Sequence, residues 1–191
     1  QGLSDRITVL LQDYRDLRGS FDRLVSIEMI EAVGHRYLAT YFAQCCRLLK
    51  SDGMMALQAI TIPDERYDDY RKNVDFIQKY IFPGGHIPSL GEMAAIFEPN
   101  RFTVLDVENL RLHYARTCAD WLANFEAVAD RVTDRFDEAF ARMWRLYLAG
   151  ASAGFRSGTL QLYQVVFAHG DSDAVPWTRD YMYPGARGPR V

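Results

Sequence analysis

The chain has 191 residues, of which 49% are hydrophobic, and a formal net charge of −3. A chain of this length suits one domain with a full core, and its composition is that of a globular protein. The mild acidic balance argues against nucleic acid as a partner, and no apolar run reaches the length of a membrane span. Contact with a membrane surface stays open, because it needs only a local patch.

Two apolar runs near the start predict strands at residues 7–11 and 24–27. The second run is followed at once by two carboxylates, Glu28 and Glu31. Side chains just past the carboxyl end of a buried strand lie where open α/β sheets bind their ligands. The same carboxylates would also stabilise the start of a helix through its dipole. The pattern therefore marks this strand end as a candidate site and leaves both interpretations open.

A helix and a third strand come next in the chain. Residues 36–49 carry apolar side chains at helical spacing, so one face of this helix is expected to be buried. The Ser-Asp-Gly sequence at 51–53 ends the helix, and residues 54–62 predict a strand that Pro63 ends. Strand, helix and strand form a βαβ unit, which implies a parallel sheet with right-handed crossovers.

The middle of the chain is less regular. Apolar spacing predicts a helix over residues 67–80, and the prolines and glycines of 82–88 require a loop. Ser89 and Glu92 have the spacing of a capping box for a short helix. The remaining elements are expected to be a strand at 102–110, helices at 114–128 and 135–155, and a strand at 160–168. We expect residues 171–191, rich in Gly, Pro and Arg, to be a poorly ordered tail.

The cysteines are Cys45, Cys46 and Cys118. Their odd number and the adjacent pair argue against a disulfide framework. Cys45 and Cys46 fall in a helical pattern, so we interpret them as small core residues. This usage favours a reducing, cytoplasmic compartment.

Four separated segments match one family in the same order. They are FDRLVSIEMIEAVG at 21–34, LQAITIPDERY at 57–67, FIQKYIFPGGHIPSL at 76–90 and FRSGTLQLYQVVFAHG at 155–170. In this order they resemble the cyclopropane-fatty-acyl-phospholipid synthases. That family of S-adenosylmethionine-dependent methyltransferases includes the mycolic acid cyclopropane synthases. The resemblance covers about residues 5–170.

The resemblance implies an α/β fold with the Rossmann-like sheet of class I methyltransferases. The sheet would be incomplete, because the first two strands and the glycine-rich loop that binds the methionine part of the cofactor are missing from the sequence. Gly84-Gly85 follows Pro83 in a loop and is no substitute. We therefore expect residues 1–170 to be the C-terminal portion of a methyltransferase domain, from a gene fragment or a truncated form, that binds the cofactor poorly by itself.

The implied reaction transfers a methyl group from S-adenosylmethionine to the double bond of an unsaturated acyl chain in a membrane phospholipid. The resulting cation loses a proton and closes a cyclopropane ring, and the resemblance implies bicarbonate as the base. Such an enzyme would be cytoplasmic and in peripheral contact with the inner face of the membrane; whether it forms a homodimer stays open. Lipid carbon methylation without ring closure is one alternative. A non-catalytic fragment that binds lipid or a partner chain is another.

Four residues carry over to the catalytic positions of the family. Glu31 resembles the carboxylate that orients the bicarbonate, and Tyr114 resembles the phenol that donates to it. The backbone of Ile60 resembles a further contact. Gln58 stands where many members have His, and its amide can donate a hydrogen bond but cannot share a proton.

Four more residues carry over to the cofactor. Asp13, Tyr14 and Arg15 resemble the loop that borders the adenine. Ile27 resembles the apolar contact at the end of the next strand. Each of them follows or ends a predicted strand, which agrees with ligand binding at that edge of the sheet.

Other residues leave their roles open. Glu31 and His35 are four apart, as in some metal sites, but no third ligand has matching spacing and no metal is expected. Tyr80 and Phe82 would either enter a bilayer or pack beneath their loop. The apolar stripe of the helix at 135–155 would form core or line an acyl channel, and the pattern does not separate the two.

Overall fold

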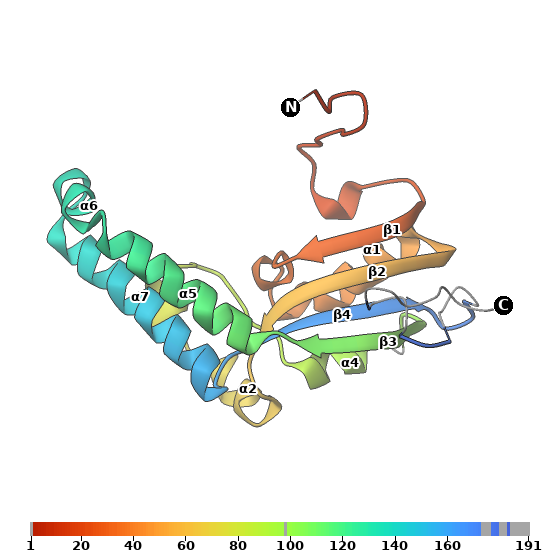
Figure 1. Ribbon diagram of the computed structural model, residues 1–191. Helices are drawn as coiled ribbons and strands as arrows, with labels where there is room; N and C mark the ends of the chain where they lie inside the picture. Colours follow the sequence, from red (N-terminus) through yellow and green to blue (C-terminus); the bar gives the residue numbers. More distant parts are fainter. Residues whose placement is uncertain (1, 98, 173–176, 180–182, 184–191) are drawn as a thin grey trace.

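The computed structural model describes residues 2–97, 99–172, 177–179 and 183. Within this part of the chain, four strands form one mixed sheet in the order β1-β2-β4-β3 (Figure 1). The strands are β1 (Phe21–Ile27), β2 (Leu49–Thr61), β3 (Phe102–Asn109) and β4 (Gln161–His169). The first two are parallel, and β4 is antiparallel to both of its neighbours. The α/β class and the parallel βαβ unit are therefore as predicted, while the last strands reverse direction.

The helices follow the predicted order with shifted limits, except that the short helix at Ala129–Arg135 was not predicted. They are α1 (Leu38–Leu48), α2 (Asp64–Tyr70), α3 (Phe76–Tyr80), α4 (Leu90–Phe97), α5 (Arg111–Glu126), α6 (Ala129–Arg135) and α7 (Glu138–Ser157). Single 3-10 turns lie at Tyr14–Asp16, Ile30–Ala32 and His35–Tyr37. The helix predicted at 67–80 is two helices, because Asp75 forms a capping box with Gln78 and starts a new one. Asp137 likewise caps α7 by accepting from the backbone N–H of Phe140.

The main core lies between one face of the sheet and the helices α1 and α4. Alternate residues of β2, among them Leu57 and Ala59, point into it because side chains of a strand alternate between faces. Phe42 of α1 and Phe97 of α4 meet there edge to face, with ring centroids 5.1 Å apart. Gln58 and Ile60 alternate with the core residues of β2, so they project from the other face of the sheet.

The strand predicted at residues 7–11 is wrong. The structure has no strand there, and the side chains of Val9 and Leu11 are 89% and 107% exposed. A strand needs a neighbour for its backbone N–H and C=O groups. Within the described residues β1 is an edge strand, which pairs with β2 on one side and with no strand on the other, so the apolar run at 7–11 stays extended and unpaired.

A helical hairpin projects from the end of the sheet (Figure 1). Helix α7 returns alongside α5, and α6 lies at the tip. Phe125, Ala141 and Leu148 form a separate small core between the two long helices. At the base of the hairpin, Cys118 and Phe155 are buried against Leu162 of β4 and join the hairpin to the sheet. No helix in the described part of the chain is long and apolar enough to cross a membrane.

Three further predictions concern the cysteines, the tail and the loop. Cys45 is buried in the core as predicted, Cys46 is only partly buried against it, and all three cysteines are free thiols. The tail predicted at 171–191 lies mostly outside the described residues. The loop predicted at 82–88 is confirmed.

Candidate active site

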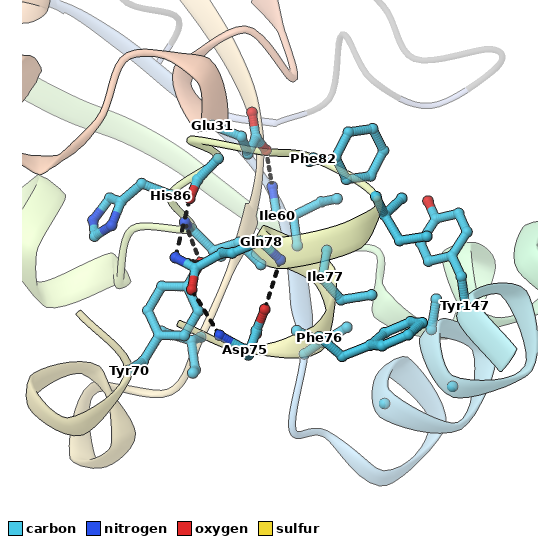
Figure 2. Close-up of a pocket in the computed structure, with 18 of the residues that line it drawn as sticks. Glu31, Ile60, Tyr70, Asp75, Phe76, Ile77, Gln78, Phe82, His86 and Tyr147 are labelled. Atoms are coloured by element: carbon cyan, nitrogen blue, oxygen red, sulfur yellow. Dashed lines mark hydrogen bonds between the residues drawn. The ribbon is translucent and has the colours of Figure 1, made fainter. Parts of the chain in front are cut away.

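A cavity of about 1220 Å³ opens where β1 and β2 reach their carboxyl ends. One side is the base of the α5–α7 hairpin, and the other is the segment from α2 to the loop at 82–88. Glu28, Glu31 and Tyr114 are polar groups of its lining. Most of the wall is apolar and aromatic, as Figure 2 shows for Ile77, Phe82 and Tyr147, among others. A concave apolar space with a few converging polar groups is the usual form of a small-molecule or lipid site.

Glu31 lies at the polar end of the cavity on the turn after β1. Its Oε1 accepts a hydrogen bond from the backbone N–H of Ile60 at 2.7 Å (Figure 2). Its Oε2 is buried and accepts no hydrogen bond from any described residue. Burial raises the pKa of Glu31 to about 7, against the opposing Ile60 N–H and with a smaller contribution from the nearby Glu28 charge. Near neutral pH this carboxyl can therefore hold or release a proton.

Glu28 lies at the centre of a hydrogen-bonded group that we call the rim cluster: Glu28, Gln58, Tyr114 and Gln164. Its Oε1 accepts from the Gln58 side-chain amide at 2.8 Å, and its Oε2 accepts from the Tyr114 hydroxyl at 2.7 Å. The Gln58 carbonyl oxygen in turn accepts from the amide of Gln164 at 2.8 Å. The rim cluster thus joins β1, β2, β4 and α5 at one point.

Tyr114 is positioned by the way α5 leaves the sheet. The N–H of Leu110, just before α5, donates to the carbonyl of Leu162 on β4. The ring of Tyr114 packs edge to face on Phe155 of α7, with centroids 5.0 Å apart. Burial, and then the carboxylate of Glu28, raise the pKa of Tyr114, so the phenol stays protonated and can donate.

The loop at 82–88 is held against this end of the cavity. The N–H of His86 donates to the backbone carbonyl of Glu31 at 2.8 Å. The amide of Gln78 donates to the carbonyl of Gly85, and the N–H of Ile87 donates to the hydroxyl of Tyr70 (Figure 2). These bonds give an irregular segment fixed partners, so it forms part of the wall.

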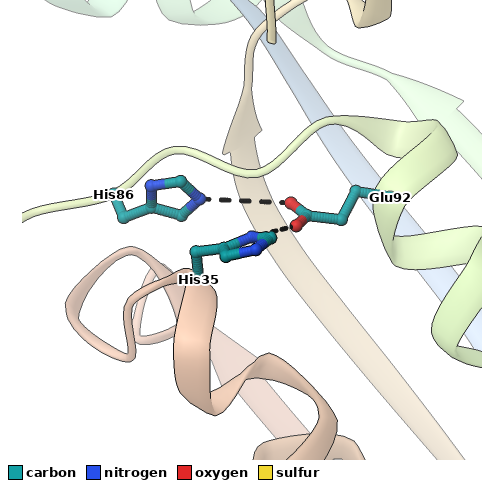
Figure 3. Close-up of side chains that lie close together, drawn as sticks. All are labelled: His35, His86 and Glu92. Atoms are coloured by element: carbon teal, nitrogen blue, oxygen red, sulfur yellow. Dashed lines mark hydrogen bonds and ion pairs between the residues drawn. The ribbon is translucent and has the colours of Figure 1, made fainter. Parts of the chain in front are cut away.

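A second polar group lies beside the loop, and we call it the histidine cluster: His35, Tyr67, His86 and Glu92. Nδ1 of His35 lies 2.5 Å from Glu92 Oε1, and the hydroxyl of Tyr67 lies 2.8 Å from Nε2 of His86 and 2.9 Å from Nδ1 of His35. Figure 3 shows both histidines turned toward Glu92. Ligand atoms of His35, His86 and Glu92 lie within 4.8 Å of one another. The cluster links the turn before α1, α2, the loop and α4. Oε2 of Glu92 lies 4.0 Å from Nε2 of His86 and is buried without a hydrogen-bond partner among the described residues.

Glu92 departs from its predicted use. Its backbone N–H forms the expected cap by donating to the hydroxyl oxygen of Ser89 at 3.1 Å. Its side chain, however, turns to His35. Burial raises the pKa of Glu92, but His86, Tyr67 and His35 outweigh burial and hold the pKa below its ordinary value. The capping box is therefore only half formed.

The structure brings together the four residues predicted for catalysis, with one change of partner. Glu31, Ile60 and Tyr114 line the same cavity, and Gln58 contacts it through Glu28. The hydroxyl of Tyr114, however, donates to Glu28 and not to a group held by Glu31. The central role of Glu28 is absent from the sequence prediction, which left that residue ambiguous. Its position directly after the apolar strand was the available signal.

The residues predicted for the cofactor lie apart from the cavity. The carboxylate of Asp13 is paired with Arg15, whose backbone N–H it also accepts, and this pairing lowers the pKa of Asp13 to about 2. Tyr14 packs edge to face on Tyr41 of α1. Ile27 is 64% exposed at the end of β1, next to Glu28. The side chain of Ile27 is therefore open to contact, whereas both carboxylate oxygens of Asp13 accept hydrogen bonds from Arg15.

Comparison with solved structures defines the class of protein. The crystal structure of mycolic acid cyclopropane synthase CmaA1 complexed with SAH and CTAB matches with a TM-score of 0.75 at 31% sequence identity, over 83% of this chain and 59% of that chain. The cyclopropane synthase MmaA2 from Mycobacterium tuberculosis matches with the same TM-score at 26% identity, over 86% and 63% of the two chains. The fold is thus that of the class I S-adenosylmethionine-dependent methyltransferases.

The family itself follows from the sequence comparison. The model of the family described as mycolic acid cyclopropane synthetase matches residues 1–165, and the chain belongs to this family. Tuberculostearic acid methyltransferase UfaA1 of Mycobacterium tuberculosis is 46% identical over 165 residues, which cover 85% of this chain and 39% of that protein. Cyclopropane-fatty-acyl-phospholipid synthase of Escherichia coli K12 is 42% identical over 86% of this chain and 42% of that protein. The chain therefore spans about two fifths of the length of these relatives.

Proposed function

We propose that this chain is the part of a methyltransferase that holds the lipid and the reacting double bond. The whole enzyme would transfer a methyl group from S-adenosylmethionine to an unsaturated acyl chain of a phospholipid and close a cyclopropane ring. The observation that carries this proposal is the cavity, because its apolar length suits an acyl chain and two carboxylates and a phenol meet at one end. Relatives named as a tuberculostearic acid methyltransferase and as a cyclopropane-fatty-acyl-phospholipid synthase support the substrate class.

The residues of this chain would do three things in that reaction. S-adenosylmethionine, when bound, supplies a methyl group on a sulfonium leaving group. The apolar walls exclude water, which would otherwise capture a cation on the acyl chain. Glu31, with a pKa of about 7, can hold a proton at the polar end. Tyr114 and Gln58 supply neutral donors there.

Methylation without ring closure is the second candidate. The observation that favours it is the 46% identity to a relative named as a tuberculostearic acid methyltransferase. Both outcomes begin with the same methyl transfer. Loss of a methyl proton from the resulting cation closes the ring, whereas a 1,2-hydride shift before that proton is lost gives a methylene branch.

Lipid analysis of cells that express the complete gene tests the proposal. Mass spectra of the phospholipids should show acyl chains that gain one methylene, compared with cells that carry the empty vector. A proton spectrum of the same lipids then separates a cyclopropane ring from a methylene or methyl branch. Unchanged phospholipids under conditions where the protein is folded and abundant would contradict the proposed function.

A substitution at Gly150 tests whether the cavity holds the acyl chain. Gly150 lies on α7 and lines the cavity, and a Cβ added there meets nothing within 4 Å. Gly150→Leu should therefore fold and yet narrow the space, and we expect turnover of long acyl chains to fall by about 10-fold. Gly150→Ala is the control, because it adds only a methyl group and removes a helix-interior glycine, which stabilises the helix by about 0.5–1 kcal/mol. Equal lipid turnover in both variants would show that the acyl chain binds elsewhere.

A further inference from the structure

The Tyr114 hydroxyl and the Gln58 amide converge on a carboxylate that belongs to the protein. The resemblance assigned these two groups to the neighbourhood of a bound bicarbonate. In the structure each of them donates to a different oxygen of Glu28, at 2.7 and 2.8 Å. A carboxylate and a bicarbonate present the same pair of acceptor oxygens. The place between the two donors is therefore filled by a side chain.

The surrounding atoms are arranged for an acceptor at this place. The Gln58 carbonyl oxygen accepts from Gln164, which leaves the amide N–H of Gln58 turned toward Glu28. The phenol of Tyr114 is fixed by its packing on Phe155. Both donors are thus set by contacts that do not involve Glu28, on β4 and on α7.

The backbone of Glu28 provides independent support. Its φ is +52°, in the left-handed region that residues other than glycine rarely adopt. Its backbone N–H donates to the carbonyl of Gln58 at 2.9 Å, which holds this conformation at the end of β1. A strained residue that lines a cavity is a common feature of functional sites. In this conformation the carboxylate of Glu28 reaches Gln58 of β2 and Tyr114 of α5.

We propose that the carboxylate of Glu28 is the resident base of this site, in place of a bound bicarbonate. The proposal rests on the proposed function. The π electrons of the double bond form a bond to the methyl carbon, and the electron pair of the broken carbon–sulfur bond leaves with sulfur. A cation remains on the second alkene carbon. Glu28 takes a proton from the new methyl group, and the electron pair of that C–H bond closes the ring.

The neighbouring Glu31 is less suited to this step. One of its oxygens is held by the Ile60 N–H and the other is buried without a donor, an arrangement that favours a neutral carboxyl group. Glu28 has each oxygen on one neutral donor, so its carboxylate is held on the wall of the cavity with lone pairs left on both oxygens. Glu28 then returns the proton to water through the mouth of the cavity.

Glu28→Gly in the enzyme expressed from its complete gene is the decisive variant. Glycine adopts a φ of +52° without strain, so the backbone should keep its course, and removal of the side chain leaves a gap between Tyr114 and Gln58. We expect methyl transfer to fall by about 100-fold. Added bicarbonate or acetate should restore at least about a tenth of the wild-type rate by entering the gap. Glu108→Gln, which removes an exposed carboxylate on β3, is the control and should leave the rate unchanged.

A binding measurement gives a readout that does not depend on turnover. In carbon-13 spectra, labelled bicarbonate should bind to the Glu28→Gly variant and not to the wild type, where the carboxylate occupies the place. Wild-type activity should also be unchanged in buffer stripped of carbon dioxide. Loss of wild-type activity on stripping, or bicarbonate bound to the wild type beside Tyr114, would overturn the proposal.

A second variant guards against a folding defect. Glu28→Gln keeps the size of the side chain and an acceptor oxygen but cannot take a proton. It should be folded and as slow as Glu28→Gly, without rescue by bicarbonate. Full activity of either variant would overturn the role of Glu28 while leaving the proposed function intact. A wild-type enzyme that is folded and methylates no lipid would overturn both.

Discussion

Two polar groups flank the loop at 82–88, and they are built on different plans. The rim cluster holds one carboxylate between neutral donors, with Glu28 and Tyr114 on the wall of a cavity. In the histidine cluster the carboxylate of Glu92 meets two imidazole rings, and the cluster links the turn before α1 with α2, the loop and α4. Both clusters connect secondary structure elements, but the carboxylate of the rim cluster lines the cavity, whereas in the histidine cluster only His86 does so. A carboxylate that borders open space is available for chemistry, and one that does not contributes to stability. The difference predicts which substitutions lower activity and which lower stability.

The largest effect is expected for Glu31, which lies beside the rim cluster. Burial favours the neutral form of the Glu31 carboxyl, and Glu31→Gln keeps an oxygen for the Ile60 N–H but removes the acidic O–H at the polar end of the cavity. Product formation by the complete enzyme should fall by about 100-fold, while the folded fraction seen by circular dichroism stays constant. Activity equal to that of the wild type would show that the carboxyl group of Glu31 takes no part in the reaction.

The same variant should also change how stability depends on pH. The pKa of Glu31 is about 7 in the folded protein and near 4.5 when the chain is unfolded. The folded state then binds the proton more tightly, so the wild type loses stability as pH rises from about 4.5 to about 7, and the loss is complete above that range. Above pH 7, Glu31→Gln should be more stable than the wild type by up to ~3 kcal/mol.

Urea unfolding of both proteins at several pH values measures this difference. The stability gap should be close to zero at pH 4.5 and should widen toward pH 7. A gap that is constant with pH would mean that Glu31 is not buried as described. Glu65→Gln on α2 serves as the reference for removing one exposed carboxylate.

Much of the fold was predictable because its signals are local. The apolar runs of β1 and β2 and the helical spacing of α1 each have a period that indicates one kind of element. The run at 7–11 has the same local signal and forms no strand, because a strand also requires a partner. The prediction of one helix over residues 67–80 was wrong for a different reason. The apolar spacing is continuous there, but the capping box at Asp75 starts a new helix.

The candidate site was predictable only in part. Spacing and resemblance indicated Glu31, Ile60 and Tyr114, and the structure places all three on one cavity. Sequence distance gives no information about which donor meets which acceptor, so the bond from Tyr114 to Glu28 was missed. The left-handed backbone of Glu28 was also hidden, since a residue other than glycine gives no sequence signal for a positive φ.

The smallest effect is expected for the histidine cluster, and it should appear in stability. Glu92→Ala removes the carboxylate that faces the half-exposed His35 and the buried His86. Loss of such a hydrogen bond typically costs about 1–2 kcal/mol, and urea unfolding at pH 7 should show a loss in that range. Glu65→Ala is a matched control, because Glu65 also lies in the first turn of a helix but is exposed.

The stability difference between the wild type and Glu92→Ala should also depend on pH, and its direction gives a second test of the contrast between the two clusters. The pKa of Glu92 lies below its ordinary value in the folded protein, so its stabilising contribution is present above about pH 4.5 and is lost as pH falls further. The difference between wild type and Glu92→Ala should therefore shrink in acid, opposite in direction to that of Glu31→Gln. Lipid turnover per folded molecule should change by less than about twofold, because none of the bonds of the rim cluster involves Glu92. A large loss of turnover with unchanged stability would mean that the histidine cluster, and not the rim cluster, borders the chemistry.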